Sequence, residues 1–286
     1  MVTAQVRGEL VRYDSASHQF TPYLSGISAM GVNFSRDGKW VTYVSYPEGV
    51  LWRSKVDGGE RLQLTSPPLF AMLPRWSPDG TRIAFMAHQP GKPWSVYVIP
   101  AEGGSSDQPT PADHRGADPN WSPDGNSLLF GRNPVDEAPG AGTLDLEIVD
   151  LRTHAISKVP GSEGMYSPRW SPDGRHILAF PGAADRLMLF DFKTQRWTEL
   201  AKINVGWPEW SRSGDYIYFS GNPPAGQPGL FRVRISDHKL EQVVSLKDFR
   251  NAPSWGSWMG LAPDDSLLLV RDAGTQDIYA LDWEAP

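Results

Sequence analysis

The sequence predicts an all-β protein, a six-bladed β-propeller of four-stranded antiparallel blades, and three observations support this. The string Trp-Ser-Pro-Asp-Gly occurs three times without change, and three altered copies accompany it. An aromatic or apolar anchor therefore recurs every 40 to 51 residues, which is typical of propeller blades. The 28 glycines and 26 prolines suit many short strands joined by turns. The six anchors are Phe34, Trp76, Trp121, Trp170, Trp210 and Leu261.

Each repeat is predicted to form four strands, from the innermost to the outermost. The inner strand leads into the anchor, and Ser-Pro-Asp-Gly then forms a turn, because Pro presets φ, Asp hydrogen-bonds locally and Gly accepts the final geometry. Short apolar runs follow at once and predict second strands that are buried between neighbouring blades. These runs are 40–44, 82–86, 127–130, 176–180, 216–219 and 266–270.

The third strands alternate apolar and polar residues, and the outer strands are more polar, as expected near a rim. Third strands are predicted at 94–99, 144–149, 186–190, 230–235 and 277–283. Examples of outer strands are 60–65, 197–200 and 239–244.

The two ends of the chain predict how the ring closes. The chain opens with a third-strand pattern at 8–13 and a fourth-strand pattern at 20–24, whereas the last repeat stops after 277–283. We therefore expect an N-terminal strand to complete the C-terminal blade, which leaves no free sheet edge between first and last. One third strand is then surplus. The surplus suggests a chain cut from a longer parent, with residues 1–286 forming one propeller domain.

The composition narrows the function classes. The formal net charge is −6 with both signs scattered, so nucleic-acid binding is not expected. The absence of cysteine excludes disulfides, thiol catalysis and cysteine zinc sites. No apolar stretch approaches about 18 residues, so we expect no membrane contact by this chain. We also expect a monomer.

The repeats resemble the WD40-like (PD40) repeats of TolB-type propellers. The resemblance rests on Pro74 to Gly80 with the strand at 82–85, and on the later strand at 277–282, and it covers nearly the whole chain. Such repeats build TolB, the propellers of prolyl-oligopeptidase and tricorn-type peptidases, and the sensory part of some bacterial membrane-anchored winged-helix regulators. The segment 279–284 resembles the last group most. That resemblance implies a sensor domain outside the membrane, in the periplasm.

The 12 tryptophans suit ligand stacking, but four of them share one repeat position. Trp76, Trp121, Trp170 and Trp210 are therefore predicted to pack between blades, since a side chain that buries about 150–250 Å² suits such a contact. The Asp of each Asp-Gly turn is likewise interpreted as a turn residue before it is considered as a metal ligand.

Repeat positions at which residues differ are better candidates for function, since a structural role tends to keep them alike. If the inner strands surround an axial channel, the position before the anchor places two cations, one anion and two amides beside it. Two interpretations stay open: a ring of ion pairs and hydrogen bonds around trapped water, or binding of a peptide or small polar ligand. The residues at this position are Asn33, Arg75, Asn120, Arg169, Glu209 and Gly260.

A second candidate set lies three and four residues before the anchors, where the outer-to-inner loops enter the ring. These loops share one face with the long loops 132–142 and 221–229, and the longest loop, 245–258, adds Phe249 and Trp255. Large amphipathic side chains dominate binding hot spots, so this face is a candidate protein-binding surface. The set comprises Met30, Met72, Leu73, Asp118, Tyr166, Trp207 and Trp258.

Signals for catalysis are poor. The sequence has no Gly-x-Ser-x-Gly elbow, no glycine-rich phosphate loop after a strand, and no two of its six histidines at ligand spacing. A calcium-dependent hydrolase of the six-bladed lactonase type would need carboxylates and amides converging on the channel. Asn33, Asn120, Asp118 and Glu209 keep this alternative open, whereas two arginines in the same ring would repel a divalent ion.

We therefore predict a non-catalytic binding module without cofactor or metal, whose partner is a protein or peptide docked at the channel mouth. The calcium-dependent hydrolase is the alternative, and arginine–glutamate contacts across the channel would favour the binding module. The predicted site residues are Asn33, Arg75, Asn120, Arg169, Glu209, Asp118, Tyr166, Trp207, Trp255 and Trp258.

Overall fold

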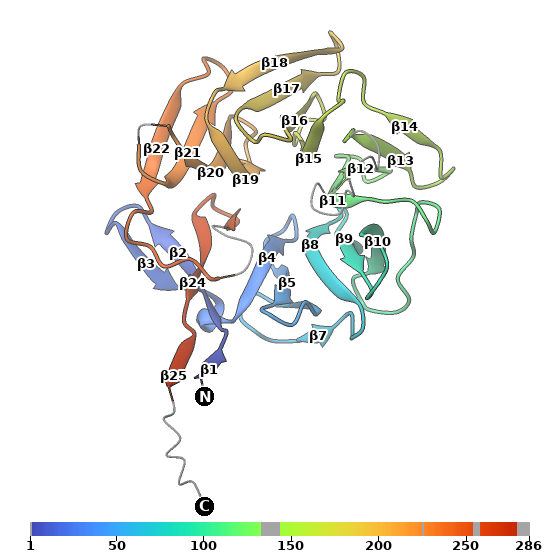
Figure 1. Ribbon diagram of the computed structural model, residues 1–286. Helices are drawn as coiled ribbons and strands as arrows, with labels where there is room; N and C mark the ends of the chain where they lie inside the picture. Colours follow the sequence, from blue (N-terminus) through green and yellow to red (C-terminus); the bar gives the residue numbers. More distant parts are fainter. Residues whose placement is uncertain (1, 133–143, 225, 254–257, 279–286) are drawn as a thin grey trace, which may run out of the picture.

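The described strands form a closed ring of six antiparallel sheets around an axis (Figure 1). A computed structural model describes residues 2–132, 144–224, 226–253 and 258–278. Within these ranges the helical content is a single 3₁₀ turn, η1 (Leu24–Gly26). The predicted all-β six-bladed propeller is confirmed.

The inner two strands of every blade are placed as predicted. Each inner strand ends at its anchor, and the tight turn that follows returns the chain into the second strand. The inner strands are β4 (Ala29–Phe34), β8 (Phe70–Trp76), β11 (Ala117–Trp121), β15 (Met165–Trp170), β19 (Asn204–Trp210) and β23 (Met259–Leu261). The second strands are β5 (Trp40–Ser45), β9 (Arg82–His88), β12 (Ser127–Gly131), β16 (His176–Pro181), β20 (Tyr216–Asn222) and β24 (Leu267–Asp272).

The third and outer strands complete the blades toward the rim. In the second blade the outer strand is reduced to one bridge, between Val98 and Asp107. The third strands are β6 (Leu51–Lys55), β10 (Ser95–Pro100), β13 (Glu147–Asp150), β17 (Leu187–Asp191), β21 (Gly229–Arg234) and β2 (Gly8–Asp14). The outer strands are β7 (Leu62–Gln63), β14 (Ile156–Lys158), β18 (Arg196–Ala201), β22 (Leu240–Ser245) and β3 (Gln19–Pro22).

The closing blade combines both ends of the described chain, which confirms the predicted closure. Its strand order is β23-β24-β2-β3, so two N-terminal strands supply the third and outer places, and Gly8 pairs with Asp272. The third strand predicted at 277–283 is wrong. Instead, β25 (Thr275–Ile278) pairs with β1 (Val2–Gln5) in a two-stranded ribbon that leaves the ring (Figure 1). Residues 279–286 lie outside the described residues, and the ribbon accounts for the surplus strand.

Burial explains why β2 takes the third place in this blade. Leu10 and Val11 are fully buried and pack on opposite sides of the sheet, one toward the first blade and the other toward the fifth. The predicted segment offers Asp277 and Asp282 among its residues, and burying unpaired carboxylates between blades is costly.

The core of the ring lies between blades. One cluster joins Ala84 and Val96 of the second blade to Trp121, Leu128 and Phe130 of the third, all of them buried. The anchor tryptophans pack against such clusters, as predicted: Trp76 and Trp121 are buried, while Trp170 and Trp210 are half-buried. Contact between blades therefore uses the anchor position, which leaves the preceding position to face the axis.

Candidate functional site

Five of the six inner strands carry a β-bulge at the same repeat position. The register of each with its second strand shifts within the four residues before the anchor, as between Met30 and Asn33 ahead of Phe34. Bulges bend a strand and re-aim its side chains, and a positive φ is an outlier for a bulky residue. The third residue before the anchor has a positive φ in each of these strands: Gly31, Leu73, Asp118, Ser167 and Trp207.

The charged residues of the predicted channel set form one connected network across the ring. Arg75 Nη2 donates to Glu209 Oε1 at 2.5 Å, and Arg169 Nη1 lies 2.8 Å from Asp118 Oδ2. Arg169 Nε lies 3.5 Å from the same Glu209 oxygen. Burial opposes the charge of Arg169, but the two neighbouring carboxylates outweigh it and raise the pKa of the guanidinium above its usual value. The network spans the second, third, fourth and fifth blades.

The two amides of the set have a structural role that the sequence did not reveal. Asn33 Oδ1 accepts a hydrogen bond from the backbone N–H of Trp76 at 2.8 Å, and Asn120 Oδ1 accepts one from Trp170 at 2.7 Å. At the second-to-third and fourth-to-fifth junctions, an indole N–H donates to the carbonyl of an arginine on the preceding blade: Trp121 to Arg75 at 2.9 Å, and Trp210 to Arg169 at 3.2 Å. Every junction from the first blade to the fifth is thus bridged beside the axis.

This network favours a ring of ion pairs and hydrogen bonds over a binding site for a peptide or small polar ligand. It does not, however, satisfy every buried polar atom. Arg75 Nε, Arg169 Nη2 and Asp118 Oδ1 are buried without a hydrogen-bond partner among the described residues. Such groups cost free energy in a dry interior. The channel wall therefore keeps unmet hydrogen-bonding capacity.

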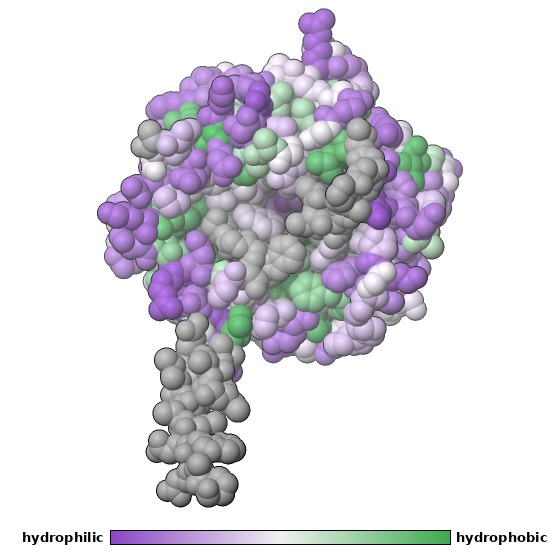
Figure 2. Space-filling model, viewed as in Figure 1, coloured by the Kyte–Doolittle hydropathy of each residue, from purple (hydrophilic) through white to green (hydrophobic). Residues whose placement is uncertain are grey.

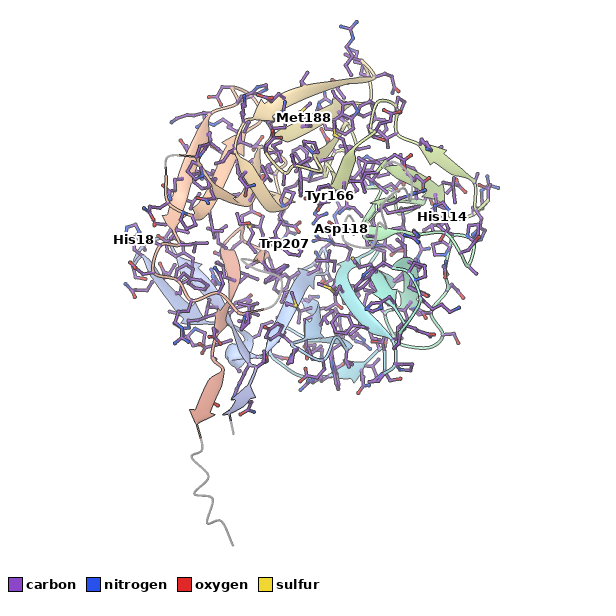
Figure 3. The ribbon with its side chains drawn as sticks, viewed as in Figure 1. His18, His114, Asp118, Tyr166, Met188 and Trp207 are labelled. Carbon is purple, nitrogen blue, oxygen red and sulfur yellow. The ribbon has the colours of Figure 1, made fainter. Side chains whose placement is uncertain are left out.

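The second predicted set divides between the core and the mouth. Figure 3 labels Asp118, Tyr166 and Trp207 around the centre of the ring, and Figure 2 shows that the molecule is hollowed there. Tyr166 and Trp207 are half-buried. Burial raises the pKa of the Tyr166 phenol, whose ring packs on Phe180 with 4.5 Å between centroids.

The remaining members of this set are less available. Met30, Met72, Leu73 and Trp258 are buried in one core cluster, so they fill the mouth from within instead of presenting a surface. Trp255 lies outside the described residues. Of this set, the half-buried Tyr166 and Trp207 and the buried Asp118 remain as candidates at the channel mouth. Phe249 of the loop 245–258 is also half-buried, but its ring packs on Phe20 of the outer strand β3.

A cavity at the opposite end of the channel was missed by the sequence reasoning. It has a volume of about 600 Å³ and is lined by the Ser-Pro-Asp-Gly turns as well as by the inner strands. Its rim includes Arg36 and Arg212, which stand where the repeated turn has proline. The signal in the sequence was this replacement, because two turns depart from the repeat in the same way at the same position.

Histidines and acids do not assemble a metal centre in the described ranges. No group of three or more His, Cys, Asp or Glu side chains there could hold a metal ion. His114 pairs with Glu147 at 2.6 Å, away from the axis (Figure 3). Among the same residues, no helix is long and apolar enough to cross a membrane.

Solved structures with a similar fold include TolB-like propellers and a lyase. The putative TolB from Agrobacterium tumefaciens aligns with a TM-score of 0.73 at 18% identity, covering 94% of this chain and 99% of that chain. An oligogalacturonate lyase in complex with manganese aligns with a TM-score of 0.61 at 12% identity, covering 94% and 98%. At these identities the likeness concerns the fold, and it defines a TolB-like β-propeller.

Sequence comparison gives the family. Residues 46–254 match the family described as the Tricorn protease N-terminal beta propeller domain, and the chain belongs to this family. A curated relative, the uncharacterized peptidase YuxL of Bacillus subtilis (strain 168), is 27% identical over 207 residues, or 68% of this chain. The chain spans 30% of the length of that relative.

Proposed function

We propose that this propeller is a non-catalytic docking module that binds a peptide or an extended protein segment at the loop-face mouth of its channel. The observation that carries the proposal is Trp207. This large side chain is half-buried at the mouth and sits on a bulge with a φ of 52°. Sparsely populated backbone conformations cluster at ligand clamps, and tryptophan is enriched among binding hot spots.

The names of the relatives support a peptide as the ligand class. The family is named for the propeller of a protease, and the curated relative is named a peptidase. A rigid ring that presents loops on one face can hold such a segment without covalent chemistry. The neighbouring Asp118 and Tyr166 would supply an acceptor and a phenol to its backbone.

The alternative, a calcium-dependent hydrolase, fits the channel residues less well. Calcium requires six to eight oxygen ligands. The side-chain oxygens of Asn33 and Asn120 each accept a backbone N–H, and Glu209 and Asp118 each face an arginine. A divalent ion would have to compete with two guanidinium groups for the same carboxylates.

The resemblance to bacterial regulators extends this proposal to a sensory role. In that role the propeller docks its partner in the periplasm and reports to a winged-helix DNA-binding domain elsewhere in a longer protein.

The test is peptide capture by the purified propeller. The folded protein is incubated with a randomised peptide pool, and retained peptides are identified by native mass spectrometry and measured by calorimetry. Trp207→Ala should weaken binding at least about 10-fold, as loss of a hot-spot side chain does. The matched control is Trp197→Ala on β18, the outer strand of the fourth blade, a half-buried tryptophan that packs in a different core cluster, which should leave affinity unchanged. Equal binding by both variants, or no retained peptide, would refute the docking proposal.

A further inference from the structure

The cavity of about 600 Å³ at the turn end of the channel is rich in hydrogen-bond donors and positive charge. Four arginines line it, Arg36, Arg75, Arg169 and Arg212, with a single acid, Glu209. Including Asp118, which pairs with Arg169 at the channel wall, two carboxylates face four guanidinium groups. The whole chain carries a net charge of −6, so the positive charge of this cavity is opposite in sign to the net charge of the protein.

The guanidinium groups of two of the four arginines form no ion pair with a carboxylate of the described residues. Arg212 donates from Nη2 to the carbonyl of Arg36 at 2.8 Å and from Nη1 to that of Pro263 at 3.3 Å, while the Asp265 carboxylate near it accepts its backbone N–H. The Arg36 side chain is exposed and makes no hydrogen bond or ion pair with any described residue. Its guanidinium is therefore available at the cavity rim.

The cavity floor has more donors than acceptors, although Glu209 and Asp118 pair with its arginines. Arg75 and Arg169 are more than nine-tenths buried, and Arg75 Nε and Arg169 Nη2 have no acceptor among the described residues. The amide nitrogens of Asn33 and Asn120 likewise make no hydrogen bond with described residues, since only the oxygens of these side chains are engaged. A ligand that fits must bring acceptor atoms and negative charge.

We propose that this cavity binds a small organic anion through an oxyanion group, a carboxylate or a phosphate, with Arg36 as the residue that contacts it from the rim. The volume of about 600 Å³ lies within the range of small-molecule sites. Guanidinium groups recognise both oxyanions in a bidentate manner. The site is at the opposite end of the channel from the peptide mouth, so anion binding and peptide docking can be measured separately.

The repeat supplies a conservative variant for the test. Arg36→Pro restores the turn that three other blades use, and the backbone N–H of Arg36 makes no hydrogen bond with any described residue that proline would remove. Arg36→Glu reverses the charge without changing the backbone. The matched control is Arg175→Ala, which removes an exposed arginine from the fourth-blade turn, outside the lining of the cavity.

The experiment measures citrate and inorganic phosphate binding by calorimetry and by thermal shift at constant ionic strength. We expect saturable binding of at least one anion, about 10-fold weaker binding by Arg36→Pro, loss of binding by Arg36→Glu, and wild-type affinity for Arg175→Ala. Preference for citrate identifies a carboxylate ligand, and preference for phosphate a phosphorylated one. If neither anion binds, or all variants bind alike, the cavity holds only water and the proposal fails. Peptide capture measured in the same samples reports on the docking function separately.

Discussion

Two arcs of the ring connect their turns by different means. From the second to the fifth blade, the turns meet through glycine and proline: a Cβ placed on Gly125 would lie 3.6 Å from Pro78, one on Gly174 would lie 3.4 Å from Pro123, and one on Gly214 would lie 3.7 Å from Pro172. These contacts are apolar and repeat from blade to blade, as the Trp-Ser-Pro-Asp-Gly string does.

From the fifth blade through the sixth to the first, one arginine joins all three turns, and this arc keeps a glycine–proline contact where a Cβ placed on Gly38 would lie 3.5 Å from Pro263. Arg212 donates its backbone N–H to Asp265 at 2.9 Å and its guanidinium to the carbonyls of Pro263 and Arg36. The departure from the repeat therefore falls where the ring closes. Unchanged repeat residues therefore carry packing between blades. The changed residue Arg212 instead makes polar contacts across the closing arc, and the changed residue Arg36 leaves its charge at the surface.

Truncation of an anchor should show the largest difference between the two arcs. Trp121→Ala removes a buried indole and its hydrogen bond to Arg75, so it should lower the free energy of unfolding by about 3–5 kcal/mol. Leu261→Ala, at the same position of the closing blade, removes a half-buried side chain and should cost about 2 kcal/mol or less. Urea denaturation followed by circular dichroism measures both. Equal costs would show that the closing arc packs as the others do.

Neutralising the acid shared by two arginines should have the next largest effect. Glu209→Gln leaves Arg75 and Arg169 short of a counter-charge in a buried setting, and the loss should be about 3 kcal/mol. Asp185→Asn, which removes an exposed partner of Arg186, should leave the denaturation midpoint unchanged. An unchanged midpoint in Glu209→Gln as well would mean that water already screens the channel pair.

The turn carboxylates should respond to pH in opposite directions. Hydrogen bonds from the Ser122 hydroxyl and the Asn126 amide lower the pKa of Asp124, so its stabilisation is present above the ordinary carboxyl pKa and is lost as the pH falls through the lower folded value. Burial raises the pKa of Asp265 despite its hydrogen bond from Arg212, so its ionisation costs stability at neutral pH.

The corresponding variants should separate in thermal unfolding at pH 7. Asp124→Asn should melt below the wild type and Asp265→Asn above it, and both differences should shrink below about pH 4, where the carboxyls protonate. A lower melting temperature for Asp265→Asn at pH 7 would show that its hydrogen bond to Arg212 outweighs the burial of its charge.

The sequence predicted the ring well because its signals are local. The turn string, the apolar second strands and the alternating third strands each depend on neighbours along the chain, and the N-terminal patterns were enough to predict closure. The choice between 8–13 and 277–283 for the third place was not local. Both segments alternate apolar and polar residues. The segment 8–13 takes the third place because Leu10 packs toward the first blade and Val11 toward the fifth.

The candidate site was predicted in part. Repeat alignment found Arg75, Arg169 and Glu209 because they vary at one position, yet it could not tell which acid faces which base across the ring. Arg36 and Arg212 were passed over as altered turns. Their significance depends on an approach between the first and fifth blades that no spacing in the sequence encodes.

The closing blade also sets an order of events during synthesis. Glu9 on β2 pairs with Arg271 on β24, 262 residues further along the chain. A ribosome therefore releases β2 and β3 long before their partner strand exists. Until then their edges and the buried faces of the first and fifth blades stay open to other chains. The nascent propeller is most exposed to misassembly just before its last strands emerge, so chaperone dependence should be greatest for chains stalled short of β24.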